Sequence, residues 1–142
     1  MSTNEHSSMT ALSNLRHGLR TPLNVILGYS EMLLEDLELA NEQKNYHELQ
    51  QIRECTIELI SLIKTLLSNE TLEFYELDLP KLLTEQTVQA QMQVPTNSII
   101  NYCQQILATT NDKSLISDVK KINRASQELL AMINDMIGIS RS

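Results

Sequence analysis

The chain has 142 residues and a formal charge of −7, and it contains no Trp, one Phe, three Gly and three Pro. This length is enough for one domain with a hydrophobic core, and the scarcity of aromatic and turn-forming residues favours long helices over a sheet. The negative charge argues against nonspecific binding to nucleic acid, and the sequence shows neither an apolar run of membrane-spanning length nor a signal peptide. We therefore expect a cytoplasmic, all-α protein whose partners include neither nucleic acid nor a membrane.

The first predicted helix runs from about Met9 to about Leu39, after a polar tail of residues 1–8 that we expect to be flexible. Its apolar residues recur at steps of three, four or seven, as the buried face of an amphipathic helix requires: Leu12, Leu15, Leu19, Leu23, Ile26, Leu33 and Leu37. Pro22 lies inside this span, but the stripe passes through it without a change of phase. The pattern therefore predicts one long helix that bends at the proline.

The second predicted helix runs from about Lys44 to Leu67 and follows a turn at residues 40–43, with Asn41 or Asn45 as its N-cap. Its apolar face also repeats at threes and fours, at Leu49, Ile52, Thr56, Leu59, Ile63 and Leu66. The first two helices, residues 9–68, are thus expected to form an antiparallel hairpin. Cys55 and Cys103 both lie in predicted helices, and we interpret them as reduced thiols that pack in the protein.

Residues 69–79 follow neither a helical nor an alternating pattern, and we predict a linker between two halves of the chain. Pro80 is expected in the first turn of a third helix, which runs to about Thr109 and contains Pro95. Asn111 or Asp112 would cap a fourth helix that ends near Ile139, with its stripe at Leu115, Val119, Ile122, Ser126, Leu129, Ile133 and Met136. Residues 80–142 would form a second hairpin, and the whole chain, residues 1–142, a single antiparallel four-helix bundle.

The second half repeats features of the first. Four residue types recur at an offset of 73, namely Pro22 with Pro95, Asn24 with Asn97, Ile26 with Ile99 and Tyr29 with Tyr102. In the later helix of each hairpin the offset is 70, which pairs Ile52 with Ile122, Leu59 with Leu129 and Ile63 with Ile133. We interpret the halves as a duplication. One hairpin alone would expose its apolar stripe, so we expect the second to close the core of a monomeric pseudo-dimer rather than a homodimer.

His17 lies on the side of the first helix opposite the apolar stripe. At about 100° per residue, its side chain points about 160° away from the centre of the stripe. Thr21, Asn24 and Gly28 fall on the same small, polar face. By position alone His17 is compatible with an ordinary surface histidine. A neutral imidazole in this place also offers a reachable ring nitrogen, which a phosphoryl transfer requires.

The stretch LRHGLRTPLNVILGYS, residues 15–30, resembles the H-box of sensor histidine kinases, the first helix of their dimerisation and phosphoacceptor (HisKA) domain. The resemblance implies that His17 accepts a phosphoryl group, that Arg20 helps to hold it and that Thr21 takes part in removing phosphate from a partner. It implies docking of that partner around Arg16, Asn24 and Gly28. Ordinary surface arginine remains an equal alternative for Arg16 and Arg20. In the family two hairpins dimerise into a four-helix bundle.

Two departures from the family pattern bear on mechanism. Gly18 replaces the acidic residue that is thought to assist autophosphorylation as a general base. The second half lacks the reactive residues, since Ala90 stands at the position of His17, Gln93 at that of Arg20 and Val94 at that of Thr21. The sequence also lacks the Gly-rich and Asn-rich boxes of the ATP-binding domain. We expect one phosphoacceptor site per chain and no autophosphorylation from ATP unaided.

Three functions remain open at this point. The resemblance favours a histidine phosphotransfer protein of a two-component phosphorelay, in which His17 exchanges a phosphoryl group with the Asp of response-regulator receiver domains. The chain itself would bind no cofactor or metal, and Mg²⁺ would come from the receiver. The second possibility is a non-catalytic docking module that sequesters a response regulator or regulates a histidine kinase. The third is a truncated sensor histidine kinase.

Overall fold

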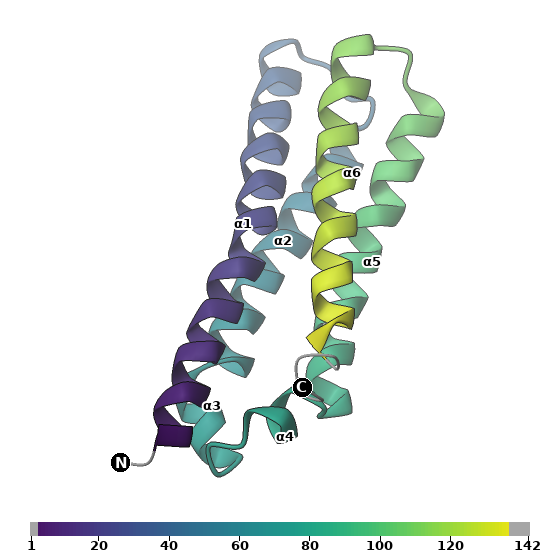
Figure 1. Cartoon of the computed structure of the whole chain (residues 1–142). Coiled ribbons are helices and arrows are strands. Elements are labelled where there is room, and N and C mark those ends of the chain that lie inside the picture. The colour runs from purple at the N-terminus through teal and green to yellow at the C-terminus, as the bar shows by residue number, and fades with distance from the viewer. Residues whose placement is uncertain (1–2, 137–142) are drawn as a thin grey trace.

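The structure is a computed structural model that describes residues 3–136. Four long helices form the predicted bundle (Figure 1): α1 (Thr3–Leu39), α2 (Tyr46–Leu66), α5 (Gln86–Thr109) and α6 (Lys113–Asn134). Helix α1 packs against α2 and α6, and α5 packs against the same two helices, so α1 and α5 occupy opposite corners. The described residues contain no strand, which confirms the all-α class. None of the helices in this range has the combination of length and apolarity that crossing a membrane requires.

Helix α1 begins at Thr3, six residues earlier than the sequence predicts, so residues 3–8 belong to a helix and not to a tail. Residues 3–8 contain neither Gly nor Pro, so nothing in them breaks a helix. Met9 packs against the core, and the helix continues from there to its N-terminal end at Thr3. Pro22 lies inside α1 and Pro95 inside α5, and both helices continue through their proline as predicted. The predictions for residues 1–2 and for Ile139 fall outside the described residues.

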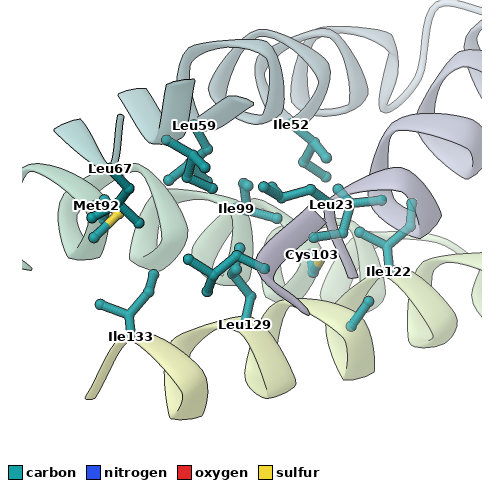
Figure 2. Packing of buried hydrophobic residues seen from close by; sticks show 14 of the residues in the cluster. Leu23, Ile52, Leu59, Leu67, Met92, Ile99, Cys103, Ile122, Leu129 and Ile133 are labelled. Carbon is teal, nitrogen blue, oxygen red and sulfur yellow. The ribbon is translucent and has the colours of Figure 1, made fainter. Parts of the chain in front are cut away.

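The apolar stripes of the four long helices meet in one core (Figure 2). The side chains that point toward one another are fully buried and come from each helix in turn: Leu23, Ile52, Leu59, Ile99, Cys103, Ile122 and Leu129. Burying a leucine or isoleucine stabilises a protein by about 1.5–3 kcal/mol relative to leaving it in water. The core therefore fixes the rotation of each helix, including the rotation of α1 that decides where His17 points.

Burial should make one of the two thiols unreactive. It raises the pKa of Cys103 to about 12, and for Cys55 burial first, then Glu58 and Glu54, raise the pKa. Roughly one Cys103 in 10,000 then carries a thiolate at pH 8. We expect a thiol reagent such as DTNB to reach Cys103 only as the bundle unfolds, which the absorbance with and without urea measures. Rapid release of two equivalents from the folded protein would contradict this burial.

The predicted linker, residues 69–79, contains the short helix α3 (Asn69–Phe74), and a second short helix, α4 (Leu79–Leu83), begins at its last residue. The Ser68 hydroxyl caps α3 by accepting a hydrogen bond from the amide of Thr71 at 3.1 Å. The Asp78 carboxylate caps α4 by accepting one from the amide of Lys81, also at 3.1 Å. Helices of five and six residues are too short to show a helical period, so their pattern reads as irregular.

The predicted continuous helix from Pro80 to Thr109 is wrong, because α4 ends at Leu83 and α5 begins at Gln86. Pro80 does lie in the first turn of a helix, as expected, but that helix is α4. Helices α3 and α4 lie at one end of the bundle (Figure 1), and their side chains Leu72, Leu82 and Leu83 are fully buried. The break between α4 and α5 lies at residues 84–85, directly after the buried Leu82 and Leu83.

The opposite end of the bundle carries the two hairpin turns. Asn45 occupies the N-cap position of α2 with a φ of 68°, but its side chain makes no cap bond. The side-chain Nδ2 of Asn45 instead donates a hydrogen bond to the Thr109 hydroxyl at 3.0 Å. This bond joins the first turn to the end of α5. Asp112 caps α6, as one of the two predicted alternatives, because its carboxylate accepts hydrogen bonds from the amides of Ser114 and Leu115.

Candidate functional site

His17 projects from the outward face of α1, in the half of the bundle that α3 and α4 close. It is exposed, whereas Leu12 and Leu19 on the opposite face of the same helix are fully buried. The core thus turns the imidazole toward solvent and anchors the helix that carries it. A ring held in this way is accessible to a phosphoryl donor that approaches from outside the bundle.

The predicted neighbours of His17 lie on the same exposed face of α1. Thr21, Asn24 and Gly28 are all exposed, and the Thr21 hydroxyl donates to the backbone carbonyl of His17 at 3.3 Å. Further along α1 is a shallow hollow of about 300 Å³ lined by Asn24, Val25, Gly28, Tyr29 and Met32. Val25 is 39% exposed and Met32 41%, so this hollow offers apolar surface on α1, two or more turns beyond His17.

The two arginines beside His17 have different surroundings. Arg16 is half-buried, and its Nη1 donates to the carbonyl of Leu67 at 2.6 Å, where Leu67 is the C-cap of α2. Arg20 is exposed and takes part in no ion pair within residues 3–136. Arg16 therefore links α1 to the end of α2, and its predicted docking role stays a prediction. Arg20 has a guanidinium available for an anion.

We expect Arg16→Ala to lower the free energy of unfolding by about 1.5–3 kcal/mol, because the Leu67 carbonyl loses a charged hydrogen-bond donor. Urea denaturation followed by circular dichroism measures the change. Arg20→Ala removes the same charge one turn later and should change the stability by no more than about 0.5 kcal/mol. Equal losses in the two variants would show that the contact with Leu67 contributes nothing specific.

Gly18 is half-buried beneath a side chain from α6. A Cβ atom at Gly18 would lie 3.1 Å from the Cε of Met132, which is tighter than an ordinary contact. The second hairpin therefore fills the space next to His17 that a side chain at residue 18 would enter. Because the end of a methionine is flexible, a larger residue requires Met132 to move. Sequence reasoning identified Gly18 but missed Met132, since no sequence pattern reveals which residues of α1 and α6 face each other.

Other polar groups between α1 and α2 lie away from His17. A hollow of about 450 Å³ near the first turn is lined by acidic residues of α1 together with Tyr46, Gln50 and Arg53. There Arg53 pairs with Glu31 at 3.4 Å, and the Tyr46 hydroxyl donates to Glu38, a bond that raises the pKa of Tyr46. Within residues 3–136, no three side chains of His, Cys, Asp or Glu gather as metal ligands would.

The matching face of α5 lacks this chemistry. Ala90 and Val94 are exposed, and Val94 is 66% exposed. They line a hollow of about 360 Å³ with Glu58, Leu62, Gln91 and Pro95. Gln93 is half-buried, and its side-chain amide donates to the side-chain oxygen of Asn134 at 2.9 Å. The α5 side of this hollow therefore offers apolar and neutral polar groups but no imidazole, and α2 adds the carboxylate of Glu58.

Residues 8–73 match the family described as "His Kinase A (phospho-acceptor) domain". The matched span includes His17, the hairpin of α1 and α2, and most of α3. This agrees with the resemblance read from residues 15–30.

Curated relatives include three histidine kinases. "Sensor histidine kinase YcbM" of Bacillus subtilis (strain 168) is 36% identical over 76 residues, which cover 54% of this chain and 24% of the relative. "Probable histidine kinase 4" of Oryza sativa subsp. japonica is 40% identical over 68 residues, 48% of this chain and 6% of the relative. "Histidine kinase 1" of Arabidopsis thaliana is 37% identical over 62 residues, which cover 44% of this chain and 5% of the relative. The chain thus spans a quarter or less of these relatives, and no solved structure matches it.

Proposed function

Residues 8–73 belong to the His Kinase A (phospho-acceptor) domain family, and on that premise we propose that the chain is a histidine phosphotransfer protein of a two-component phosphorelay. His17 would accept a phosphoryl group and exchange it with the Asp of response-regulator receiver domains. The observation that carries the proposal is the position of His17, exposed on the outer face of a helix whose inner face is fully buried.

In the proposed reaction, a neutral ring nitrogen of His17 attacks the phosphorus of the receiver's phosphoaspartate. A P–N bond forms, the P–O bond to the aspartate breaks, and the aspartate leaves as a carboxylate. The proton on the other ring nitrogen stays there or passes to water. Mg²⁺ bound by the receiver would offset the charge of the phosphoryl oxygens, and Arg20 would hold them from this chain. The reverse step delivers the group to a second receiver.

The surroundings of Gly18 support exchange with a receiver over attack on ATP. Residue 18 carries no side chain that accepts a proton, and Met132 lies against the place where such a side chain would be. The general base that the family resemblance assigns to autophosphorylation is therefore missing from this position. Transfer from a phosphoaspartate makes a smaller demand, because the receiver supplies its own acidic pocket and metal ion.

We further propose that the second hairpin is a degenerate copy of the first and that one chain makes a monomeric pseudo-dimer. Matching positions are buried alike, for example Ile26 with Ile99 and Leu59 with Leu129. Two matching hydroxyls also make the same bond, since Thr56 and Ser126 each donate to the carbonyl four residues earlier, at 2.7 and 2.8 Å. With Ala90 in place of His17, such a chain carries one phosphoacceptor.

The exposed apolar hollow further along α1 favours a second candidate function, a docking module without chemistry. Val25 and Met32 would bind a receiver there whether or not His17 reacts. In this case the chain would sequester a response regulator or regulate a kinase.

Phosphoryl transfer from a receiver tests the proposed function. The chain is mixed with a ³²P-labelled receiver and Mg²⁺, and the labelled protein is treated with acid and with base. A phosphohistidine is acid-labile and base-stable, so label with that behaviour supports phosphotransfer. Receivers that bind tightly but never transfer label would favour the docking module instead.

A further inference from the structure

We propose that Lys64 on α2 and Arg20 on α1 together form a seat of two cations for the phosphoryl group of His17. The inference rests on the proposed phosphoacceptor function and adds a residue that the sequence pattern does not single out. Lys64 is exposed and lies in the last turn of α2, near the same end of the bundle as His17.

Two contacts set the register between α1 and α2, which pack side by side as antiparallel helices (Figure 1). Glu38 accepts a hydrogen bond from Tyr46, and Glu31 pairs with Arg53. Seven residues back along α1 therefore correspond to seven residues forward along α2. The register between α1 and α2 is therefore constant along the interface of the two helices.

The same register brings Arg20 opposite Lys64. Arg20 lies eleven residues before Glu31, and Lys64 lies eleven residues after Arg53. Eleven residues make about three turns of an α-helix, so each residue returns to nearly the same side of its helix. Lys64 therefore faces Arg20 as Arg53 faces Glu31. The interface between α1 and α2 thus has an ion pair near the first turn and a pair of cations at the end that carries His17.

The second hairpin shows the neutral version of this pair. Gln93 matches Arg20 at the offset of 73, and Asn134 matches Lys64 at the offset of 70. The side chains of Gln93 and Asn134 are hydrogen-bonded at 2.9 Å, so the two positions are within reach across a hairpin of this kind. Where Ala90 replaces the histidine, the pair carries no charge. The two cations are thus found in the hairpin that contains His17, and the neutral pair in the hairpin that contains Ala90.

The stretches of α1 and α2 that carry Arg20 and Lys64 contain no carboxylate. The chain has 18 acidic residues, yet residues 6–30 and residues 59–69 contain none. Neither cation takes part in an ion pair within the part of the chain that the structure describes. Two facing cations repel each other, and an anion between them reverses the sign of that interaction. His17 precedes Arg20 by three residues on α1, so the oxygens of a phosphoryl group on its ring come next to this pair.

The first test compares the initial rate of phosphoryl transfer from one labelled receiver to four proteins. Relative to wild type, we expect Lys64→Gln to slow transfer to His17 by about tenfold, because a charged hydrogen-bond partner is lost. Lys64→Arg keeps the cation and should restore the rate. Lys113→Gln makes the same charge change at the far end of the bundle and should behave as wild type. If Lys64→Gln transfers as fast as wild type, the seat is wrong while the role of His17 stands.

A second test needs no receiver and decides the seat even if His17 never takes up label. Inorganic phosphate is titrated against chloride at equal ionic strength, and the backbone amides of residues 17, 20 and 64 are followed by NMR. We expect saturable shifts in the wild type and weaker ones in Lys64→Gln, and their absence in the wild type would overturn the seat. The double variant Arg20→Gln/Lys64→Asn copies the neutral pair and should raise Tm, whereas a lower Tm contradicts the repulsion.

Discussion

His17→Gln is expected to abolish phosphoryl labelling of the chain and to leave the bundle and its affinity for receivers unchanged. Glutamine keeps a polar side chain but has no ring nitrogen that attacks phosphorus. The His17 side chain is exposed and makes no hydrogen bond within residues 3–136, so the fold loses no contact. A surface substitution of this kind changes stability by no more than about 0.5 kcal/mol. Loss of label would therefore report chemistry and not unfolding.

Transfer from a labelled receiver and calorimetric titration with the same receiver measure the two properties separately. His47→Gln is the matched control, because His47 is also exposed but lies at the start of α2, near the opposite end of the bundle. Label that persists on His17→Gln and disappears from His47→Gln would move the phosphoacceptor to His47. If neither the wild type nor any variant takes up label while all bind equally, the docking module is the better account.

The helices of this chain were predictable wherever one face of a long helix is buried. Residues such as Leu19, Ile52 and Ile122 repeat at threes and fours because each helix turns a single stripe toward the shared core. The same reasoning failed at residues 69–83, where α3 and α4 are shorter than two turns and their capping residues, Ser68 and Asp78, are the only local signal. Boundaries that depend on caps and on tertiary closure need the structure.

In the candidate site, too, some residues could be predicted from the sequence and others could not. His17, Thr21 and Asn24 lie on one helix, so the helical period alone places them on one face. Met132 and Lys64 come from α6 and α2, and a sequence does not state the register between helices. The structure supplies that register through individual contacts. It places Met132 of α6 against Gly18, next to His17, and it underlies the proposed place of Lys64 opposite Arg20.

Leu129→Ala is expected to destabilise the whole chain, including the hairpin that carries His17, by about 2–5 kcal/mol. Leu129 is fully buried in α6, and α6 packs against both α1 and α5 (Figure 2). Because the four long helices share one core, a cavity in the second hairpin weakens the packing of the first. A loss of this size is a large part of the 5–15 kcal/mol by which a typical domain is stable.

Hydrogen exchange of the backbone amides in α1 and α6 shows whether the two hairpins unfold together. In one cooperative bundle, Leu129→Ala lowers protection by the same factor around His17 and around residue 129. Leu39→Ala makes the same substitution at a side chain that is 81% exposed and should change neither region. If α1 keeps its protection while α6 loses it, the hairpins fold independently, and the single bundle that orients His17 is wrong. Equal losses mean that the hairpin of α5 and α6 is required to keep the hairpin that contains His17 folded.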